Sequence, residues 1–272
     1  MMPNKPFDVV LHKGPFEASD CVDIHCHCLP ALDDGPTNLA EAVTLCEALV
    51  ADGITTVIAT PHQLGRFDGC YDSAQIRQAV TSLNLTLKNC GIPLIVAPGA
   101  DVRVDERILQ LLKSDRILTL ADTGRYIMLE LPHETFMDIS SLLAELDATG
   151  VKSIISHPER NHILAREPDL ILRWAEYAPC LQITAASLAG DFGQTIQRAA
   201  WHFLDMPFAV VVATDAHNTT SRSPRMAKAF EMIAINRGAT EARKLCVSDP
   251  ICILKGQEIL SPTSAKKQKT HQ

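Results

Sequence analysis

The sequence predicts an α/β fold in which parallel strands alternate with helices, arranged as a barrel in preference to an open doubly wound sheet. Short, nearly continuous apolar runs alternate with longer segments of helical periodicity, which is typical of parallel strands covered on both faces. No Gly-x-Gly-x-x-Gly pattern follows the first run, which argues against a dinucleotide-binding open sheet. The 272 residues, 46% of them hydrophobic, suffice for one large domain, since α/β barrels commonly have about 250 residues.

Seven short apolar runs rich in β-branched residues are expected to form the strands. They comprise residues 22–24, 55–59, 94–97, 126–129, 153–155, 181–184 and 208–213. Three segments between these runs place apolar residues on one helical face. The faces are Leu39, Val43, Cys46 and Val50; Ile76, Val80, Leu83 and Leu87; and Ile139, Leu142, Leu143 and Leu146. Asn38 and Glu41 resemble a capping box, which predicts that the first helix begins directly after Asn38.

Composition and charge exclude several classes of protein. The net charge of -7 gives no support for nucleic-acid binding, which favours a basic face. No run approaches the roughly 18 apolar residues of a membrane span, and residues 1–20 lack the apolar segment of a signal peptide, so we expect neither. We expect an N-terminal extension (1–20), a single domain (21–260) and a disordered, Lys-rich polar tail (261–272). Nine cysteines without zinc-ribbon spacing indicate reduced thiols and a cytoplasmic protein.

A His-x-His pair, His25 and His27, closes the first apolar run. In a strand, residues two apart point to the same face, so both imidazoles can bind one metal ion. Cys26 and Cys28 alternate with them and are expected to point into the packing behind the strand. An isolated pair of this kind can also be read as hydrogen-bonded core histidines, and the rest of the chain decides against that interpretation.

Residue types that bind metal ions follow six of the seven predicted strands. These residues are His25 and His27, His62, Asp101, Glu130, His157, and Asp215 with His217. In βα barrels the carboxyl ends of the strands form one face, on which active sites are built, so we expect these side chains to converge. Five other histidines do not fit the pattern and are interpreted as structural or peripheral; they are His12, His133, His162, His202 and His271.

Mixed imidazole and carboxylate ligands without thiolate suit Mn²⁺, Fe²⁺, Co²⁺ or Zn²⁺, and they do not suit a closed structural zinc site. Five histidines and several carboxylates exceed the needs of one ion, so we expect two or three. Neighbouring metal ions can clamp the attacking and the leaving oxygens of an in-line displacement, which indicates hydrolysis of a phosphate ester. Arg160 and Arg222 follow His157 and His217 closely, and we interpret them as phosphate-binding rather than solvated surface arginines.

Seven sequence blocks follow one another in a fixed order from about residue 22 to residue 260. They are Val22-Asp-Ile-His-Cys-His-Cys-Leu-Pro30, Leu32-Asp-Asp-Gly-Pro36, Gly53-Ile-Thr-Thr-Val-Ile-Ala-Thr-Pro-His62, Met128-Leu-Glu-Leu-Pro132, Ile154-Ile-Ser-His-Pro-Glu-Arg160, Gln182-Ile-Thr-Ala-Ala-Ser187 and Ala213-Thr-Asp-Ala-His217. In this order they resemble the polymerase and histidinol phosphatase (PHP) superfamily. Within it, they resemble the bacterial capsule-locus and exopolysaccharide-locus protein-tyrosine phosphatases.

The resemblance implies a distorted (β/α)7 barrel and a manganese-dependent phosphatase. It implies a metal-activated water that removes phosphate from tyrosine, typically in the tail of a bacterial tyrosine kinase that controls polysaccharide export. The implied ligand sets for three ions are His25, His27, Asp101 and Asp215; Asp101, Glu130 and His157; and Asp34, His62 and His217. Asp34 is preferred to Asp33 because it holds the family's position before Gly35, and Arg160 and Arg222 match its phosphate-binding arginines.

One ligand departs from the family pattern, which is Gly-x-Glu where this chain has Gly99-Ala-Asp101. The departure leaves the metal spacing and full occupancy open. No cysteine is followed by arginine at Cys-x5-Arg spacing, so a thiolate nucleophile is not expected. Two alternatives therefore stand beside the tyrosine phosphatase. They are a small-molecule phosphatase of the histidinol-phosphate kind and a catalytically weak regulatory partner of a polysaccharide kinase.

Overall fold

The computed structural model describes residues 21–259, and the strands within this range pair in parallel in two sheets. The first sheet has the order β1-β2-β4, and the second has the order β3-β5-β6-β7-β8-β9. The strands are β1 (Val22–Cys26), β2 (Thr56–Ala59), β3 (His62–Gln63), β4 (Ile95–Pro98), β5 (Asp101–Arg103), β6 (Tyr126–Glu130), β7 (Lys152–Ser156), β8 (Cys180–Thr184) and β9 (Ala209–Ala213). The expected extension (1–20) and tail (261–272) lie outside the described residues.

All seven predicted strands are confirmed, with ends that shift by two residues or fewer. The prediction missed β3 and β5, which follow β2 and β4 after a bend and are too short to leave an apolar pattern. Each bend carries the chain from the first sheet to the second. At the second bend, a Cβ on Gly99 would lie 2.6 Å from Cγ2 of Ile58, so only glycine lets the chain pass this close to β2.

The two sheets also meet at their other edges, where β1 lies beside the segment that follows β9. Cys26 and Ala216 form an isolated parallel bridge. The backbone N–H of Asp215 donates to the carbonyl of His25 at 2.8 Å, and that of His27 donates to the carbonyl of Ala216 at 2.9 Å. This succession of strands is compatible with the expected distorted seven-stranded barrel.

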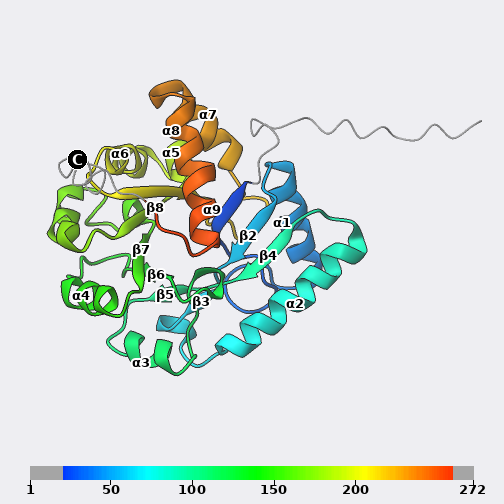
Figure 1. Cartoon of the computed structure of the whole chain (residues 1–272). Coiled ribbons are helices and arrows are strands. Elements are labelled where there is room, and N and C mark those ends of the chain that lie inside the picture. Colours follow the sequence, from blue (N-terminus) through cyan, green and yellow to red (C-terminus); the bar gives the residue numbers. More distant parts are fainter. Residues whose placement is uncertain (1–20, 260–272) are drawn as a thin grey trace, which may run out of the picture.

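Helices surround the strands, and Figure 1 shows α1 and α2 together on one side of the molecule and α4 and α6 on the other. The α-helices are α1 (Leu39–Ala51), α2 (Ser73–Cys90), α3 (Ile108–Lys113), α4 (Ser140–Ala148), α5 (Ala185–Ala189), α6 (Gln194–Phe203), α7 (Met226–Arg237), α8 (Ala239–Arg243) and α9 (Asp249–Leu254). The 3-10 helices are η1 (Gly65–Phe67), η2 (Leu120–Asp122), η3 (Pro158–Arg160) and η4 (Pro168–Tyr177), and η5 (Lys244–Ser248) is a π-helix. Within residues 21–259, every helix is too short or too polar to cross a bilayer.

The apolar core has two parts. A smaller cluster joins residues from both sheets, including Ile24, Ile58, Met128 and Val211, and Ile253 of α9 packs into it. The larger cluster lies between the strands and the helices. Burial on both sides explains why the strands read as continuous apolar runs in the sequence.

The predicted helix face is confirmed for α2 and only in part for α1, where Cys46 is buried and Val50 packs against the core. Ile76, Val80, Leu83 and Leu87 of α2 are all buried. Helix α1 begins at Leu39, as predicted, because the Asn38 side chain accepts a hydrogen bond from the backbone N–H of Glu41 at 3.0 Å. Its buried face, however, is Ala42, Leu45, Cys46 and Leu49. Leu39 is 47% exposed because the helix is rotated about its axis by about one residue relative to the prediction. Packing against the core thus selects the neighbouring apolar stripe of the helix. In α4, Leu143 and Leu146 are buried as predicted.

A register shift in β1 turns both histidines of the His-x-His pair toward one side. Val22 and Ile24 belong to the smaller apolar cluster, whereas Cys26 and Cys28 belong to the larger one. The alternation of side chains between the two faces of the strand therefore reverses between Ile24 and Cys26. The shift against β2 falls between Asp23 and Cys26. Bulges of this kind re-aim side chains and are frequent beside active sites. The expectation that the two cysteines pack behind the strand is confirmed.

Asp23 holds this shift in place. It is fully buried, and its Oδ1 accepts hydrogen bonds from the backbone N–H of His25 at 3.3 Å and of Thr214 at 3.0 Å. Its Oδ2 accepts the hydroxyl of Thr214 at 2.5 Å. One carboxylate thus ties β1 to the segment that follows β9.

Replacing Asp23 tests this tie. Asp23→Ala leaves two backbone donors and one hydroxyl buried without an acceptor, so we expect a loss of about 2–4 kcal/mol in the free energy of unfolding. Thr214→Val removes the hydroxyl that donates to Asp23 and accepts the backbone N–H of Ala216 at 3.1 Å, and it should cost about 1–3 kcal/mol. Urea denaturation in the presence of a chelator measures both values. If the losses in the double variant are additive, the two residues do not act through one another.

Candidate metal centre

The nine residues expected to bind metal lie together at the carboxyl ends of the strands. Their potential ligand atoms form four overlapping groups, and within each group these atoms lie within 4.8 Å of one another. The groups are His27, Asp34, His62 and His217; His25, His27 and Asp101; His25, His157 and Asp215; and His62, Asp101 and Glu130. Residues as far apart in the sequence as His25 and His217 come together because the parallel strands end on the same face.

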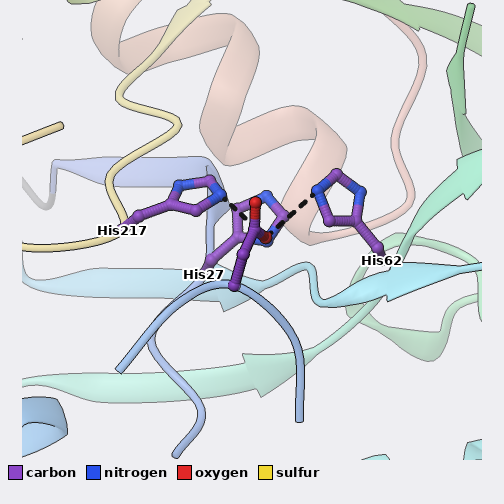
Figure 2. A group of neighbouring side chains, drawn as sticks. His27, His62 and His217 are labelled. Carbon is purple, nitrogen blue, oxygen red and sulfur yellow. Dashed lines mark ion pairs between the residues drawn. The ribbon is translucent and has the colours of Figure 1, made fainter. Parts of the chain in front are cut away.

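The first group contains one carboxylate between imidazole rings. Oδ1 of Asp34 lies 3.4 Å from Nε2 of His62 and 3.4 Å from Nε2 of His217. Figure 2 shows these two rings on either side of the carboxylate, with the His27 ring behind it. Burial raises the pKa of Asp34, but hydrogen bonds to His217 and His62 outweigh it and hold the pKa well below its usual range. The carboxylate is therefore ionised, as a metal ligand has to be.

Asp101 is the most isolated carboxylate of the centre. It is fully buried, and neither of its oxygens has a hydrogen-bond partner. Oδ2 lies 3.6 Å from Nε2 of His25, 3.6 Å from Nδ1 of His62 and 3.9 Å from Nε2 of His157. Burial, together with the charge of Glu130, raises the pKa of Asp101 to about 7. An acid in these surroundings fits a cation placed between it and the three imidazoles.

Asp215 faces the centre with one oxygen and two arginines with the other. Oδ1 lies 3.3 Å from Nε2 of His25 and 3.4 Å from Nε2 of His27, and it has no hydrogen-bond partner. Oδ2 accepts hydrogen bonds from Arg160 and, at 2.6 Å, from Arg222. Burial would raise the pKa of Asp215, but Arg222, His25 and Arg160 hold it well below its usual range. Buried acceptor atoms without partners thus lie on both Asp101 and Asp215, and this donor set fits metal ions.

Residues outside the nine fix the orientation of the imidazoles. Oε1 of Gln182 lies 2.9 Å from Nδ1 of His25, and Oδ2 of Asp33 lies 2.6 Å from Nδ1 of His27. In both rings the proton on Nδ1 leaves Nε2 directed at the carboxylates, which is the usual way in which a second contact prepares a metal-binding histidine. The sequence analysis did not assign these roles, although Gln182 lies in a quoted block and Asp33 adjoins Asp34.

Burial keeps most of the imidazoles neutral, which is the form that binds metal. It lowers the pKa of His25 to about 3 and that of His217 to about 4, and it holds the pKa of His157 well below its usual range. His27 differs: burial lowers its pKa, but Asp33 and Asp215 outweigh burial and raise it to about 10. The surroundings of His27 therefore favour a positive charge at its ring.

The backbone is strained at two of the nine residues. His157 and Asp215 have φ angles of 31° and 51°, in the left-handed region that non-glycine residues rarely adopt. The His157 N–H donates to Oε1 of Gln182 at 3.1 Å, which holds this conformation. A Cβ on Gly35 would lie 2.4 Å from the carbonyl oxygen of His27, so glycine is needed where the loop with Asp34 passes β1. Strain of this kind concentrates at functional sites.

A cavity of about 290 Å³ opens over the centre. Arg160 and Arg222 line it, as the prediction of a phosphate site requires. The cavity is also lined by residues that the sequence pattern did not single out, which are Leu64, Gly65, Arg66, Phe67, Arg103 and His133. The interpretation of His133 as peripheral is wrong: its Nε2 lies 3.3 Å from Glu130, and its ring stacks on that of His157 at 5.7 Å. It comes from the loop after β6, three residues beyond the end of the strand at Glu130, where periodicity gives no signal.

The remaining histidines differ in their placement. His162 and His202 pair with Glu134 and Asp169 through exposed side chains, which agrees with a peripheral position. His12 and His271 lie outside the described residues. All nine cysteines are described, are free and contribute no atom to the four groups.

Comparison with known proteins places this centre in a family. The model of the family described as "Capsular polysaccharide synthesis, CpsB/CapC" matches residues 21–255. The chain belongs to the CpsB/CapC family. Tyrosine-protein phosphatase YwqE of Bacillus subtilis is 33% identical over 253 residues, which cover 91% of this chain and 98% of YwqE. Tyrosine-protein phosphatase CpsB of Streptococcus pneumoniae is 28% identical over 88% of this chain and 100% of its own length.

Solved structures agree with this membership of the CpsB/CapC family. One, from work on YwqE from Bacillus subtilis and CpsB from Streptococcus pneumoniae as "unique metal-dependent tyrosine phosphatases", superposes with a TM-score of 0.83 at 33% identity. The superposition covers 88% of this chain and 96% of that chain. A β-aspartyl dipeptidase from Fervidobacterium islandicum shares the fold alone, with a TM-score of 0.54 at 14% identity over 92% of this chain and 80% of that chain.

Asp101 is the residue through which the centre is tested best. Asp101→Ala should lose bound metal and any activity together, because the carboxylate faces three imidazoles of the centre. Asp101→Glu adds one methylene, about 1.5 Å, at a fully buried position already within 3.6 Å of two imidazoles, so we expect it to overfill the centre and to lower kcat. Metal analysis beside turnover measures both. Wild-type metal content in the alanine variant would remove Asp101 from the ligands.

Proposed function

We propose that this CpsB/CapC family protein is a metal-dependent phosphatase that hydrolyses phosphotyrosine in proteins. The observation that carries the proposal is the centre itself, where nine ligand-type side chains converge beside a cavity lined by arginines. A cluster of metal ligands with adjoining guanidinium groups suits hydrolysis of a phosphate monoester. The relatives named tyrosine-protein phosphatase support the choice of substrate.

The ligands of the proposal are the nine residues of the four groups, and the metal is manganese, with two or three ions bound. Iron, cobalt or zinc would fit the same mixture of imidazole and carboxylate. Bound ions of this kind supply Lewis acidity and make water a nucleophile at neutral pH. A cysteine nucleophile is not part of the proposal, because none of the nine described cysteines lines the cavity.

Arg160 and Arg222 are proposed to bind the phosphate oxygens. Both line the cavity, both are mostly buried, and both donate to Oδ2 of Asp215. This shared contact holds the two guanidinium groups side by side at the cavity, where they can bind an anion. Their charge is thereby placed where the negative charge of a phosphoryl group develops.

The substrate is proposed to be a phosphotyrosine tail of a bacterial tyrosine kinase that regulates capsule or exopolysaccharide synthesis, in the cytoplasm. The nine free thiols agree with a reducing compartment. A small-molecule phosphatase of the histidinol-phosphate kind is the first alternative. The second is a regulatory partner with little activity, and the position of Asp101 at the middle of the centre argues against it.

Metal removal tests the proposed chemistry. Because every group proposed to activate the nucleophile is a metal ligand, chelation followed by dialysis should abolish phosphate release, and Mn²⁺ should restore it. The assay compares a phosphotyrosine peptide with histidinol phosphate. Preference for histidinol phosphate would favour the first alternative, and full turnover in excess EDTA would exclude the mechanism. His25→Ala and His157→Ala should each lower kcat by more than about 100-fold.

The arginines give a separate prediction. Arg160→Ala and Arg222→Ala should keep their metal content and lose roughly 100-fold to 1000-fold in kcat/KM, because each removes a charge that stabilises the transition state. Lysine at either position should recover only part, since an ammonium group cannot form the two-pronged contact. Arg173→Ala, on the surface turn η4, is a matched control that should change neither quantity. Wild-type kcat/KM in an alanine variant would make that arginine a surface residue.

A further inference from the structure

One wall of the cavity is formed by the turn at Leu64 and η1 (Gly65–Phe67), here called the Phe67 wall. The ring of Phe67 is half-buried and stacks on the ring of His62 at 5.6 Å with an angle of 8°. His62 belongs to two of the four ligand groups, and Figure 2 shows its ring together with those of His27 and His217. Phe67 is therefore an aromatic surface directly beside the proposed metal ligands.

The turn that carries Phe67 is strained. Leu64 has a φ of 67° and a ψ of -167°, a conformation that costs a non-glycine residue of order 1–3 kcal/mol. The next residue, Gly65, has a φ of 57°, and a Cβ there would lie 3.1 Å from Cγ of Arg103. A strained turn pressed against a neighbouring side chain persists only where the surroundings hold it, and its effect here is to present the Phe67 ring to the cavity.

The guanidinium group of Arg66 lies over the Phe67 ring. Its guanidinium carbon lies 4.7 Å from the centre of the Phe67 ring, and its Nη2 lies 2.7 Å from Oδ2 of Asp34. The Arg66 side chain is 66% exposed, so both contacts are weak in water and easily exchanged. The planar guanidinium group of Arg66 therefore covers a part of the Phe67 ring on which another planar group can pack instead.

We propose that Phe67 determines specificity by packing against the phenyl ring of the substrate, which replaces the Arg66 guanidinium on the wall. This inference rests on the proposed phosphatase function. A phosphoryl group held by Arg160 and Arg222 lies in the same cavity as the Phe67 ring, so its ester substituent passes the wall on the way out. An aryl substituent gains an aromatic contact there, and a small alkyl substituent does not. The wall thus selects aryl over alkyl phosphate monoesters.

Phosphonates test this selection without any difference in leaving group. The metal-loaded protein is titrated calorimetrically with benzylphosphonate and with methylphosphonate, and the ratio of the two Kd values is the readout. We expect the wild type to bind benzylphosphonate about tenfold more tightly, and Phe67→Ala to bring the ratio close to one while the Kd of methylphosphonate stays within about twofold. Phe67→Leu should give an intermediate ratio, and it also serves if the alanine variant does not fold.

Arg66→Ala is the matched control in the same turn. Because it removes the group that the phenyl ring replaces, it should keep or increase the ratio. An unchanged ratio in Phe67→Ala, equal weakening of both ligands, or a fall in Arg66→Ala as large as in Phe67→Ala would each overturn the inference. Hydrolysis of a phosphotyrosine peptide by the wild type is measured separately. Its absence, together with a ratio that depends on Phe67, would refute the proposed function and leave an aryl-phosphonate site.

Discussion

The buried charge of Asp101 and Asp215 is the constraint on which the rest of this structure depends. Both carboxylates are almost completely shielded from water, and three of their four oxygens have no hydrogen-bond partner. Left alone, such groups cost several kcal/mol each. Imidazole nitrogens of His25, His27 and His62 lie 3.3 to 3.6 Å from them, a spacing that suits a cation shared between ligands. The three carboxylate oxygens without a hydrogen-bond partner are therefore suited to bind metal ions.

A continuous set of buried contacts connects this centre to the fold. Asp23 joins β1 to the segment with Asp215, and Gln182 joins His25 to the backbone of His157. Each connector receives hydrogen bonds from two strands or strand ends, so displacing one ligand strains another. The apolar clusters on either side of the strands make these positions rigid, because close-packed interiors do not yield gradually. Rigid placement matters here, since a catalytic constellation loses much of its rate when it loosens by about 1 Å.

The sequence predicted what depends on local pattern and missed what depends on tertiary contact. Parallel strands buried on both faces leave apolar runs, and residues at their carboxyl ends converge by topology, so the seven strands and the convergence of eight ligand-type residues followed from the sequence pattern. Asp34 followed only from the family resemblance. Strands β3 and β5 are too short for a pattern, and the buried face of α1 was decided by packing. Gln182 and His133 act through partners far away in the sequence, which periodicity does not encode.

Asp101 shows how backbone placement compensates for side-chain length. The resemblance described above implies glutamate at this position, and aspartate reaches about 1.5 Å less far. Asp101 nevertheless approaches three imidazoles, because β5 pairs with β3 at His62 and with β6 at Met128, which fixes its Cα at the edge of the centre. The bend before β5 passes close to Ile58 of β2, and it can do so only because Gly99 has no Cβ. The reach of the ligand is thus set by the path of the chain, and a shorter acid at this position is compatible with a complete centre.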